Sequence, residues 1–364
     1  MTRVMLTVAG RRAAAEWVWY ARSDGAAALR RALTPMSWLF ARGVDWRNSA
    51  CDRDVARKAP IPAMSIGNLT VGGTGKTPVA SWFAARLVER GARPALVLRG
   101  YGDDEWRVHR LLTPDLRVLV NRDRLAALQA AQGAGADCAV LDDGFQHRRA
   151  PRVSDIVLIS ADRFDGEVRL LPAGPYRESL AALRRATALI VTAKAATEHQ
   201  VDAVYRAALA ERADLPVAVV RLEPAGIRRV VTDDGDPASR EAEGHGVEWL
   251  RGRAVLLTSA IADADALEHQ VVAHGVRLVR HVRFPDHHAF TQADAARLAA
   301  EARGSSGVLC TLKDAVKLGS LWPRAAVPLW YVSQTLVVDR GAEVLERECD
   351  RVLLARTATV PTAG

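Results

Sequence analysis

The chain has 364 residues and a formal net charge of +8; this length predicts about two domains, and the charge favours a polyanionic partner such as nucleic acid, anionic lipid or a phosphorylated substrate. A hydrophobic share of 49% and a charged share of 25% exclude a disordered tail or a collagen-like chain. Four scattered cysteines without a Cys-x-x-Cys pair, no apolar run of bilayer length and no secretory leader pattern lead us to expect no zinc site, no disulfide framework, no spanning helix and a cytoplasmic protein.

The first 58 residues are rich in tryptophan and arginine. Four of the nine tryptophans lie here, and between residues 29 and 44 apolar side chains recur at helical spacing with arginines on the other faces. This pattern predicts a basic amphipathic helix. Two interpretations remain open: the helix packs on its own domain, or it lies on a membrane surface, where indole rings and guanidinium groups are favoured.

The rest of the chain alternates short apolar strands with amphipathic helices, which is typical of a mostly parallel, doubly wound α/β sheet. We expect a first series of strands at 61–67, 95–98, 118–120, 138–141, 156–159, 189–192 and 217–220, with helices at 78–90 and 124–131. A second series of strands is expected at 254–258, 277–282, 307–311 and 329–332, with helices at 264–274 and 291–302. The predicted organisation is an N-terminal amphipathic, membrane-associating segment (1–58), a P-loop-type kinase domain (59–222), a polar linker or hairpin (223–250) and a second, smaller α/β domain (251–364).

A glycine-rich turn joins the first strand to the first helix of this series. It reads Gly67-Asn-Leu-Thr-Val-Gly-Gly-Thr-Gly-Lys-Thr77, and it departs from the strict G-x-x-x-x-G-K-[ST] pattern because Thr70 stands where the first glycine would be. Free backbone N–H groups, the helix N-terminus and a lysine can together hold phosphates, and a threonine hydroxyl can ligate Mg²⁺. We therefore predict nucleotide binding by eight consecutive residues: Thr70, Val71, Gly72, Gly73, Thr74, Gly75, Lys76 and Thr77. Lys76 is one of only five lysines among fifty basic residues.

A second motif, which is acidic, follows the apolar stretch Cys138–Leu141. Asp142 and Asp143 come directly after it, as expected of a carboxylate that holds Mg²⁺ at the end of a strand. An ordinary Asp-Asp-Gly turn is the alternative. Beside a phosphate-binding loop, the magnesium interpretation is favoured.

Six segments occur together and in order in this chain. They are Gly67–Pro78, Arg99–Gly102, Leu141–Arg148, Leu171–Glu178, Phe284–His288 and Thr311–Lys317. In this combination the chain, from about Leu33 to Lys317, resembles the tetraacyldisaccharide 4′-kinases of lipid A biosynthesis. The resemblance implies ATP- and Mg²⁺-dependent phosphorylation of the 4′-hydroxyl of a tetraacylated glucosamine disaccharide 1-phosphate. It also implies a peripheral protein on the anionic cytoplasmic face of the inner membrane, with no nucleic acid and no obligate protein partner.

The resemblance implies a catalytic pair as well. His287, after Asp286, matches the family's histidine. The family's aspartate stands in a G-D-E-P segment some way after Arg99–Gly102, whereas here Asp103-Asp104-Glu105 follows at once, as if the intervening stretch were deleted. We choose Asp104 as the base, with Asp103 or an ordinary acidic loop as alternatives.

Three further residues receive roles from the same resemblance, and a fourth, Gln146, receives one because it follows the predicted magnesium carboxylates. Arg177 and Glu178 match an Arg-Glu pair, which makes Glu178 a candidate metal ligand together with Thr77, Asp142 and Asp143. Arg124, Gln146 and Arg177 are candidate substrate contacts, since a guanidinium can hold a phosphate in bidentate fashion. In a chain so rich in arginine, a solvated surface position is the alternative for each.

Two rival functions share part of this evidence. A P-loop NTPase acting as a switch or metal-delivery factor would share the phosphate loop and Asp142 but would not need Asp104, Arg177 and His287. A basic, tryptophan-rich binding protein would need no catalytic residues. For a nucleic acid we would expect aromatic side chains interleaved with basic ones on strands, and the aromatic residues instead cluster in a helical segment.

Overall fold

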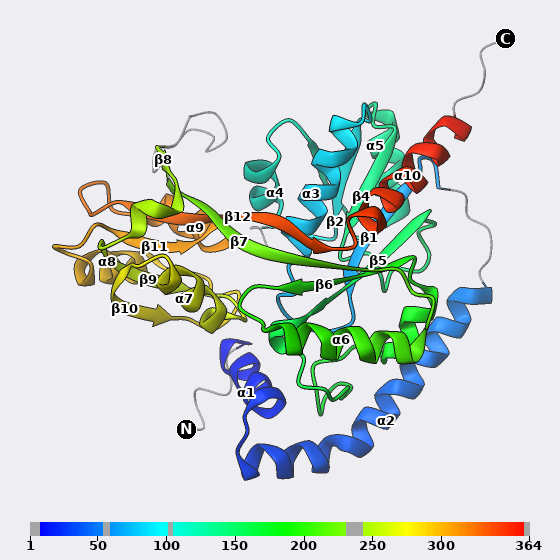
Figure 1. Cartoon of the computed structure of the whole chain (residues 1–364), viewed down its shortest axis with the longest axis horizontal. Coiled ribbons are helices and arrows are strands. Elements are labelled where there is room, and N and C mark those ends of the chain that lie inside the picture. Colours follow the sequence, from blue (N-terminus) through cyan, green and yellow to red (C-terminus); the bar gives the residue numbers. More distant parts are fainter. Residues whose placement is uncertain (1–7, 54–58, 101–104, 231–242, 360–364) are drawn as a thin grey trace. The chain divides into compact units, whose positions relative to one another are not determined.

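A computed structural model describes residues 8–53, 59–100, 105–230 and 243–359 (Figure 1). Their contacts divide the chain into two compact units. The P-loop unit consists of Ala14–Tyr101, Asp115–Arg221 and Val337–Gly364, and the insert unit of Met1–Ala13, Gly102–Pro114 and Leu222–Leu336. Both units are discontinuous in sequence, whereas the domains that we expected are consecutive segments.

The P-loop unit is built on a parallel sheet, as predicted. Its strands lie in the order β7-β6-β5-β1-β4-β2-β3, and every pair along this path is parallel. Five of them are buried at every residue because helices cover both faces, which explains their nearly continuous apolar sequences. The strands are β1 (Ala63–Asn68), β2 (Pro94–Leu98), β3 (Arg117–Val120), β4 (Cys138–Asp142), β5 (Ser154–Ser160), β6 (Ala188–Ala193) and β7 (Val217–Arg229).

The direction of the connections decides which face each helix covers. The chain crosses from β1 to β2 in one direction along the sheet, and from β3 to β4 and from β6 to β7 in the other. Because such crossovers are right-handed, α3 (Lys76–Glu89) covers one face, whereas α5 (Arg124–Gly133) and α6 (Glu198–Glu211) cover the opposite one. The direction changes beside β1, and ligands bind at such a switch point, outside the carboxyl ends of the strands.

The C-terminal helix α10 (Ala342–Thr359) also belongs to the P-loop unit. Its Glu348 is fully buried and accepts hydrogen bonds from Ser154 Oγ (2.6 Å) and Thr187 Oγ1 (2.5 Å), near the starts of β5 and β6. The sequence analysis placed this segment in the second α/β domain. A buried carboxylate with partners more than 160 residues away leaves no signal in local periodicity.

At the N-terminus the structure contains α1 (Val8–Tyr20) and a long helix, α2 (Asp24–Arg53). The latter includes the predicted helix at 29–44 and continues beyond it at both ends. One face of α2 is anchored, since Ser37 Oγ donates to Leu170 O (2.9 Å), while Trp38, Leu39 and Trp46 are 70–74% exposed. Among the described residues, no helix is both long enough and apolar enough to cross a membrane.

The insert unit contains the second α/β pattern. Its parallel strands are β10 (Arg277–Arg283), β9 (Ala254–Ser259), β11 (Val308–Thr311) and the first part of β12 (Leu329–Arg340), in that order. The helices are α4 (Glu105–Leu112), α7 (Ala264–Ala273), α8 (Gln292–Glu301) and α9 (Leu312–Leu318). Within the segment 223–250, which we expected to be a linker or hairpin, β8 (Gly244–His245) pairs antiparallel with the end of β7.

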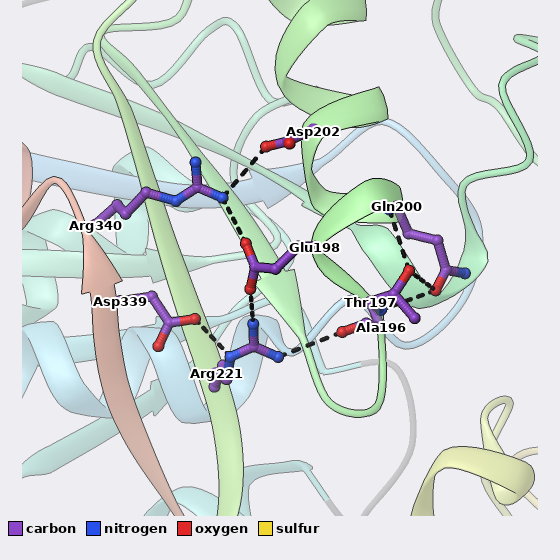
Figure 2. Close-up of polar contacts among 8 residues, drawn as sticks. All are labelled: Ala196, Thr197, Glu198, Gln200, Asp202, Arg221, Asp339 and Arg340. Atoms are coloured by element: carbon purple, nitrogen blue, oxygen red, sulfur yellow. Dashed lines mark hydrogen bonds and ion pairs between the residues drawn. The ribbon is translucent and has the colours of Figure 1, made fainter.

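Two long strands, β7 and β12, run from one unit into the other and are neighbours in the sheet. Where they lie in the P-loop unit, an ion-pair network joins them to α6 (Figure 2). Arg221 of β7 donates to Asp339 of β12 (2.5 Å) and to Glu198 of α6 (2.5 Å). Arg340 bonds Glu198 (3.0 Å) as well, so the carboxylate bridges two strands.

Candidate nucleotide and phosphoryl-transfer site

The phosphate-binding loop follows β1 and ends at the first residue of α3. Gly72 and Gly75 have φ values of 120° and 81°, in the region that favours glycine. Gly75 is the N-cap of α3 and has no side chain to cap the helix. The first backbone N–H groups of α3 are therefore suited to bind an external anion such as a phosphate. Lys76 and Thr77 are then the first two residues of the helix.

The loop is held from two sides. The Asn68 amide donates to Thr74 Oγ1 (3.0 Å), and Thr192 Oγ1 at the end of β6 donates to the Thr74 carbonyl (2.9 Å). On the other side, the segment Leu171–Glu178 lies along the loop, with Val71 N donating to Pro175 O (2.8 Å) and Arg177 N to Leu69 O (2.7 Å). The segment Leu171–Glu178, one of the six that carry the family resemblance, therefore fixes the backbone of the loop.

Two carboxylates at the end of β4 face the start of α3. Thr77 Oγ1 lies 3.3 Å from Asp142 Oδ2, and Lys76 Nζ lies 3.6 Å from Asp143 Oδ1. Arg177 also donates to Asp143 (3.1 Å). Burial opposes the charge of Asp143, but the two cations beside it hold the pKa of that carboxyl well below its usual range. Asp143 is therefore an anion that keeps both cations in place.

The insert unit carries His287, which is the predicted catalytic residue that the structure describes. His287 lies between β10 and α8, with a positive φ of 59°. Its Nε2 is 2.8 Å from Lys313 Nζ and 3.8 Å from Asp286 Oδ2. Asp104 and Asp103 lie outside the described residues. Lys313 was not among the predicted site residues, although it is one of the five lysines and lies inside the segment Thr311–Lys317.

Comparison with known proteins gives this arrangement a context. A family model described as tetraacyldisaccharide-1-P 4′-kinase matches residues 29–353. The chain belongs to the tetraacyldisaccharide-1-P 4′-kinase family. A tetraacyldisaccharide 4′-kinase from Anaeromyxobacter sp. (strain K) is 37% identical over 338 residues, covering 85% of this chain and 87% of that protein. Another, from Anaeromyxobacter sp. (strain Fw109-5), is 34% identical and covers 96% and 98%.

A solved structure agrees with the family. The crystal structure of LpxK from Aquifex aeolicus, described as an "apo" form in complex with ATP, matches with a TM-score of 0.68 at 26% identity. The match covers 89% of this chain and 99% of that one. The predicted family resemblance and the P-loop α/β fold are thus confirmed, and the chain is an ATP-dependent kinase of lipid A biosynthesis.

The oxygen donors of this 4′-kinase fit a magnesium ion that is held mainly by nucleotide and water. Thr77 and Asp142 offer a hydroxyl and a carboxylate oxygen 3.3 Å apart. Among the described residues, no group of three His, Cys, Asp or Glu side chains is placed to hold a metal by itself. Mg²⁺ is commonly bound by one or two carboxylates together with phosphates and several waters, so the donor set suits it.

The other predicted site residues of the 4′-kinase have protein partners in the structure. Arg124 is 3% exposed and donates to Asp142 O (2.8 Å). Gln146 donates to Asn68 O (2.8 Å), which links the segment after β4 to the end of β1. Glu178 is 4% exposed and pairs with Arg185 (2.8 Å). The roles of Arg124, Gln146 and Arg177 in substrate binding and of Glu178 in metal binding stay predictions, and their contacts support positioning.

Proposed function

We propose that Lys76, Thr77 and Asp142 bind Mg²⁺-ATP in the P-loop unit and that the γ-phosphoryl group passes to the 4′-hydroxyl of an acylated glucosamine disaccharide 1-phosphate. One observation carries this proposal: at the start of α3, Thr77 meets Asp142 and Lys76 meets Asp143. A phosphate-binding loop whose lysine and hydroxyl each face a carboxylate has what phosphoryl transfer requires, namely positioning and neutralisation of charge.

The residues of the chain divide this work. Backbone N–H groups of the loop and the first turn of α3 orient the phosphates, and Lys76 exchanges Asp143 for phosphate oxygens as ATP binds. Thr77 and Asp142 would hold Mg²⁺, whose positive charge would reduce the charge repulsion of the phosphates. Asp143 stays beside Arg177 (3.1 Å), and before ATP binds its negative charge offsets the positive charges of Lys76 and Arg177.

We assign the acceptor side of the reaction to the pair chosen from the sequence. Asp104 takes or orients the proton of the 4′-hydroxyl, and His287 positions the groups that react. The polar surroundings of His287, with Asp286 and Lys313 as neighbours, support a role beyond that of a surface histidine.

We also propose that α2 places the enzyme on the anionic cytoplasmic face of the inner membrane. Trp38, Leu39 and Trp46 are large apolar side chains with exposed fractions of 70–74% on a helix whose Ser37 is anchored to the P-loop unit. Indole rings partition to the headgroup region, and nearby arginines are attracted to anionic lipid. The acceptor is a lipid, so a site carried to the bilayer reaches it directly.

The decisive experiment combines purified protein, Mg²⁺-ATP and a 1-phosphorylated tetraacyl disaccharide in mixed micelles. We expect one phosphate to be added to the lipid for each ATP consumed, as measured by mass spectrometry and ADP release. Consumption of ATP at the same rate with and without the lipid would instead support an NTPase switch. A disaccharide lacking its free 4′-hydroxyl is the matched control and should give no product.

A further inference from the structure

Three side chains of the insert unit form a compact polar cluster: Asp286, His287 and Lys313. The Lys313 ammonium lies 2.8 Å from His287 Nε2 and 3.6 Å from Asp286 Oδ1. The second Asp286 oxygen lies 3.8 Å from the same ring nitrogen. All three side chains are between 15% and 33% exposed, so solvent does not surround them.

The backbone fixes the spacing between Lys313 and His287. Ala260, just after β9, donates its N–H to Asp314 Oδ2 (3.2 Å), and its carbonyl accepts from His287 N (3.1 Å). Asp314 follows Lys313, is fully buried, and also accepts from Thr311 Oγ1 (2.7 Å). Both residues are therefore tied to Ala260, and the contact between their side chains is not a chance meeting of two mobile groups.

Elementary hydrogen-bond chemistry then decides the state of the imidazole. A lysine side chain is ordinarily an ammonium group, which can only donate, and the Asp286 carboxylate lies 3.6 Å from that of Lys313. His287 Nε2 must accept, so the neutral ring carries its hydrogen on Nδ1. Asp286 by itself would favour a proton on Nε2, but its oxygen lies at 3.8 Å, beyond hydrogen-bond range, whereas Lys313 lies at 2.8 Å.

The other charged groups around the cluster have different partners. Lys317, one turn later on α9, has Nζ 3.5 Å from the His288 carbonyl. His288 points its Nε2 to Asp294 (3.2 Å). Lys313, one turn earlier on the same helix, is in contact with His287 Nε2.

We propose that Lys313 is a positioning residue that holds His287 in the Nδ1–H tautomer, so that the histidine enters phosphoryl transfer as a hydrogen-bond donor and not as a base. The inference rests on the proposed function, in which His287 positions the reacting groups. A donor held in one tautomer can orient a carboxylate or the acceptor oxygen without taking its proton. A lysine suits the task because its ammonium is a compact donor, whereas the planar guanidinium of arginine would spread over both neighbours.

The tautomer can be measured without any substrate. In full-length protein labelled with ¹⁵N in its histidine rings, the His287 resonances, assigned with a His287→Gln variant, should show a protonated Nδ1 and an accepting Nε2. Lys313→Met should move the proton to Nε2 or give a mixture, and Lys313→Arg, which keeps a donor, should restore the original pattern at least in part. Identical ring spectra of the wild type and the Met variant would overturn the proposal.

Kinetics provide the second readout. Lys313→Met should lower kcat by at least about tenfold, since a wrong tautomer disables a positioned histidine, while KM for ATP stays within about twofold. Lys317→Met, which removes the same charge from the same helix, is the matched control and should keep the normal ring spectrum. An unchanged kcat in Lys313→Met would overturn the inference. If the ring spectra behave as expected but His287→Gln remains fully active on the lipid, His287 has no role in the reaction. The conclusion that Lys313 fixes the tautomer of the ring would still be correct.

Discussion

Lys76 Nζ lies 3.6 Å from Asp143 Oδ1, so the lysine of the phosphate loop already has an anionic partner before nucleotide binds. Lys76→Met should leave the fold intact, because Arg177 remains paired with Asp143, and should lower kcat/KM on lipid and ATP by about 10² or more, because the charge clamp on the phosphates is lost. Initial rates of lipid phosphorylation test this, with Lys76→Arg as a charge-preserving control that should lose less. Near-normal turnover in the Met variant would contradict the assignment.

The two neighbouring carboxylates should separate in their dependence on magnesium. Asp142 faces the Thr77 hydroxyl, whereas Asp143 faces two cations. We expect Asp142→Asn to raise the Mg²⁺ concentration for half-maximal rate by about tenfold or more, because a carboxylate ligand is replaced by a weaker amide. Asp143→Asn should mainly raise KM for ATP. Equal Mg²⁺ titrations for the two variants would show that Asp142 is not the ligand.

His147 should make the protein sensitive to acid. Burial, with Arg124 and Arg99 nearby, lowers the pKa of His147 to about 4. An ordinary histidine titrates near 6.5, so the unfolded chain binds more protons than the native state between these values, and stability falls as the pH drops below about 6.5. His147→Gln should reduce this loss by up to about 2 kcal/mol at pH 5, measured from urea unfolding at pH 7.5 and 5. Parallel pH curves for wild type and variant would contradict the linkage.

The ion-pair network of Figure 2 should contribute to stability in a way that isolated surface pairs do not. Arg221 contacts carboxylates of both β12 and α6, and Arg221→Met should lower the free energy of unfolding by roughly 1–2 kcal/mol. Arg206→Met provides the control, because Arg206 is exposed and bonds only a carbonyl on its own helix among the contacts described. Equal shifts of the urea midpoint in the two variants would show that the network does not contribute to stability.

Membrane binding should depend on the exposed tryptophans of α2. The double variant Trp38→Ser and Trp46→Ser should bind anionic vesicles roughly tenfold more weakly, since it removes two large apolar groups from the interface. Sedimentation with vesicles of anionic and of neutral lipid, at low and high salt, measures this. Leu354→Ser on α10 has a similar exposed fraction, 71%, and should bind normally. Undiminished binding of the double variant would mean that α2 is only structural.

The sequence was sufficient to predict most of the strands, because each buried strand of the sheet is an apolar run. It predicted only half of the ten α-helices in the described residues, and it missed α1, α4, α6, α9 and α10. Two strands were predicted much too short. The predictions at 217–220 and 329–332 covered only the first residues of β7 and β12, which continue to Arg229 and Arg340. Most of the remaining residues of β7, and all those of β12, are half-buried or exposed, so no buried apolar run marks them.

The candidate site was predictable where chemistry is local and missed where it depends on distant partners. Lys76, Thr77 and Asp142 belong to compact motifs and meet as expected. Arg124 is buried at the end of β4 and donates to the Asp142 carbonyl, a contact that no sequence pattern displays, and its role in substrate binding stays a prediction. Lys313 was overlooked for the same reason: its partner lies 26 residues away, and only the folded backbone around Ala260 joins them.

The burial of Glu348 on α10 has a consequence for how the protein folds during translation. A ribosome that has made the phosphate loop, the magnesium carboxylate and the whole insert unit has still not made the helix that supplies this carboxylate to Ser154 and Thr187. Domains generally fold as units while the chain emerges, but this unit lacks a piece of its interior until α10 has left the exit tunnel. The P-loop unit therefore stays incomplete until α10 has been made, and we expect a truncation within α10 to weaken nucleotide binding although every residue of the loop is still present.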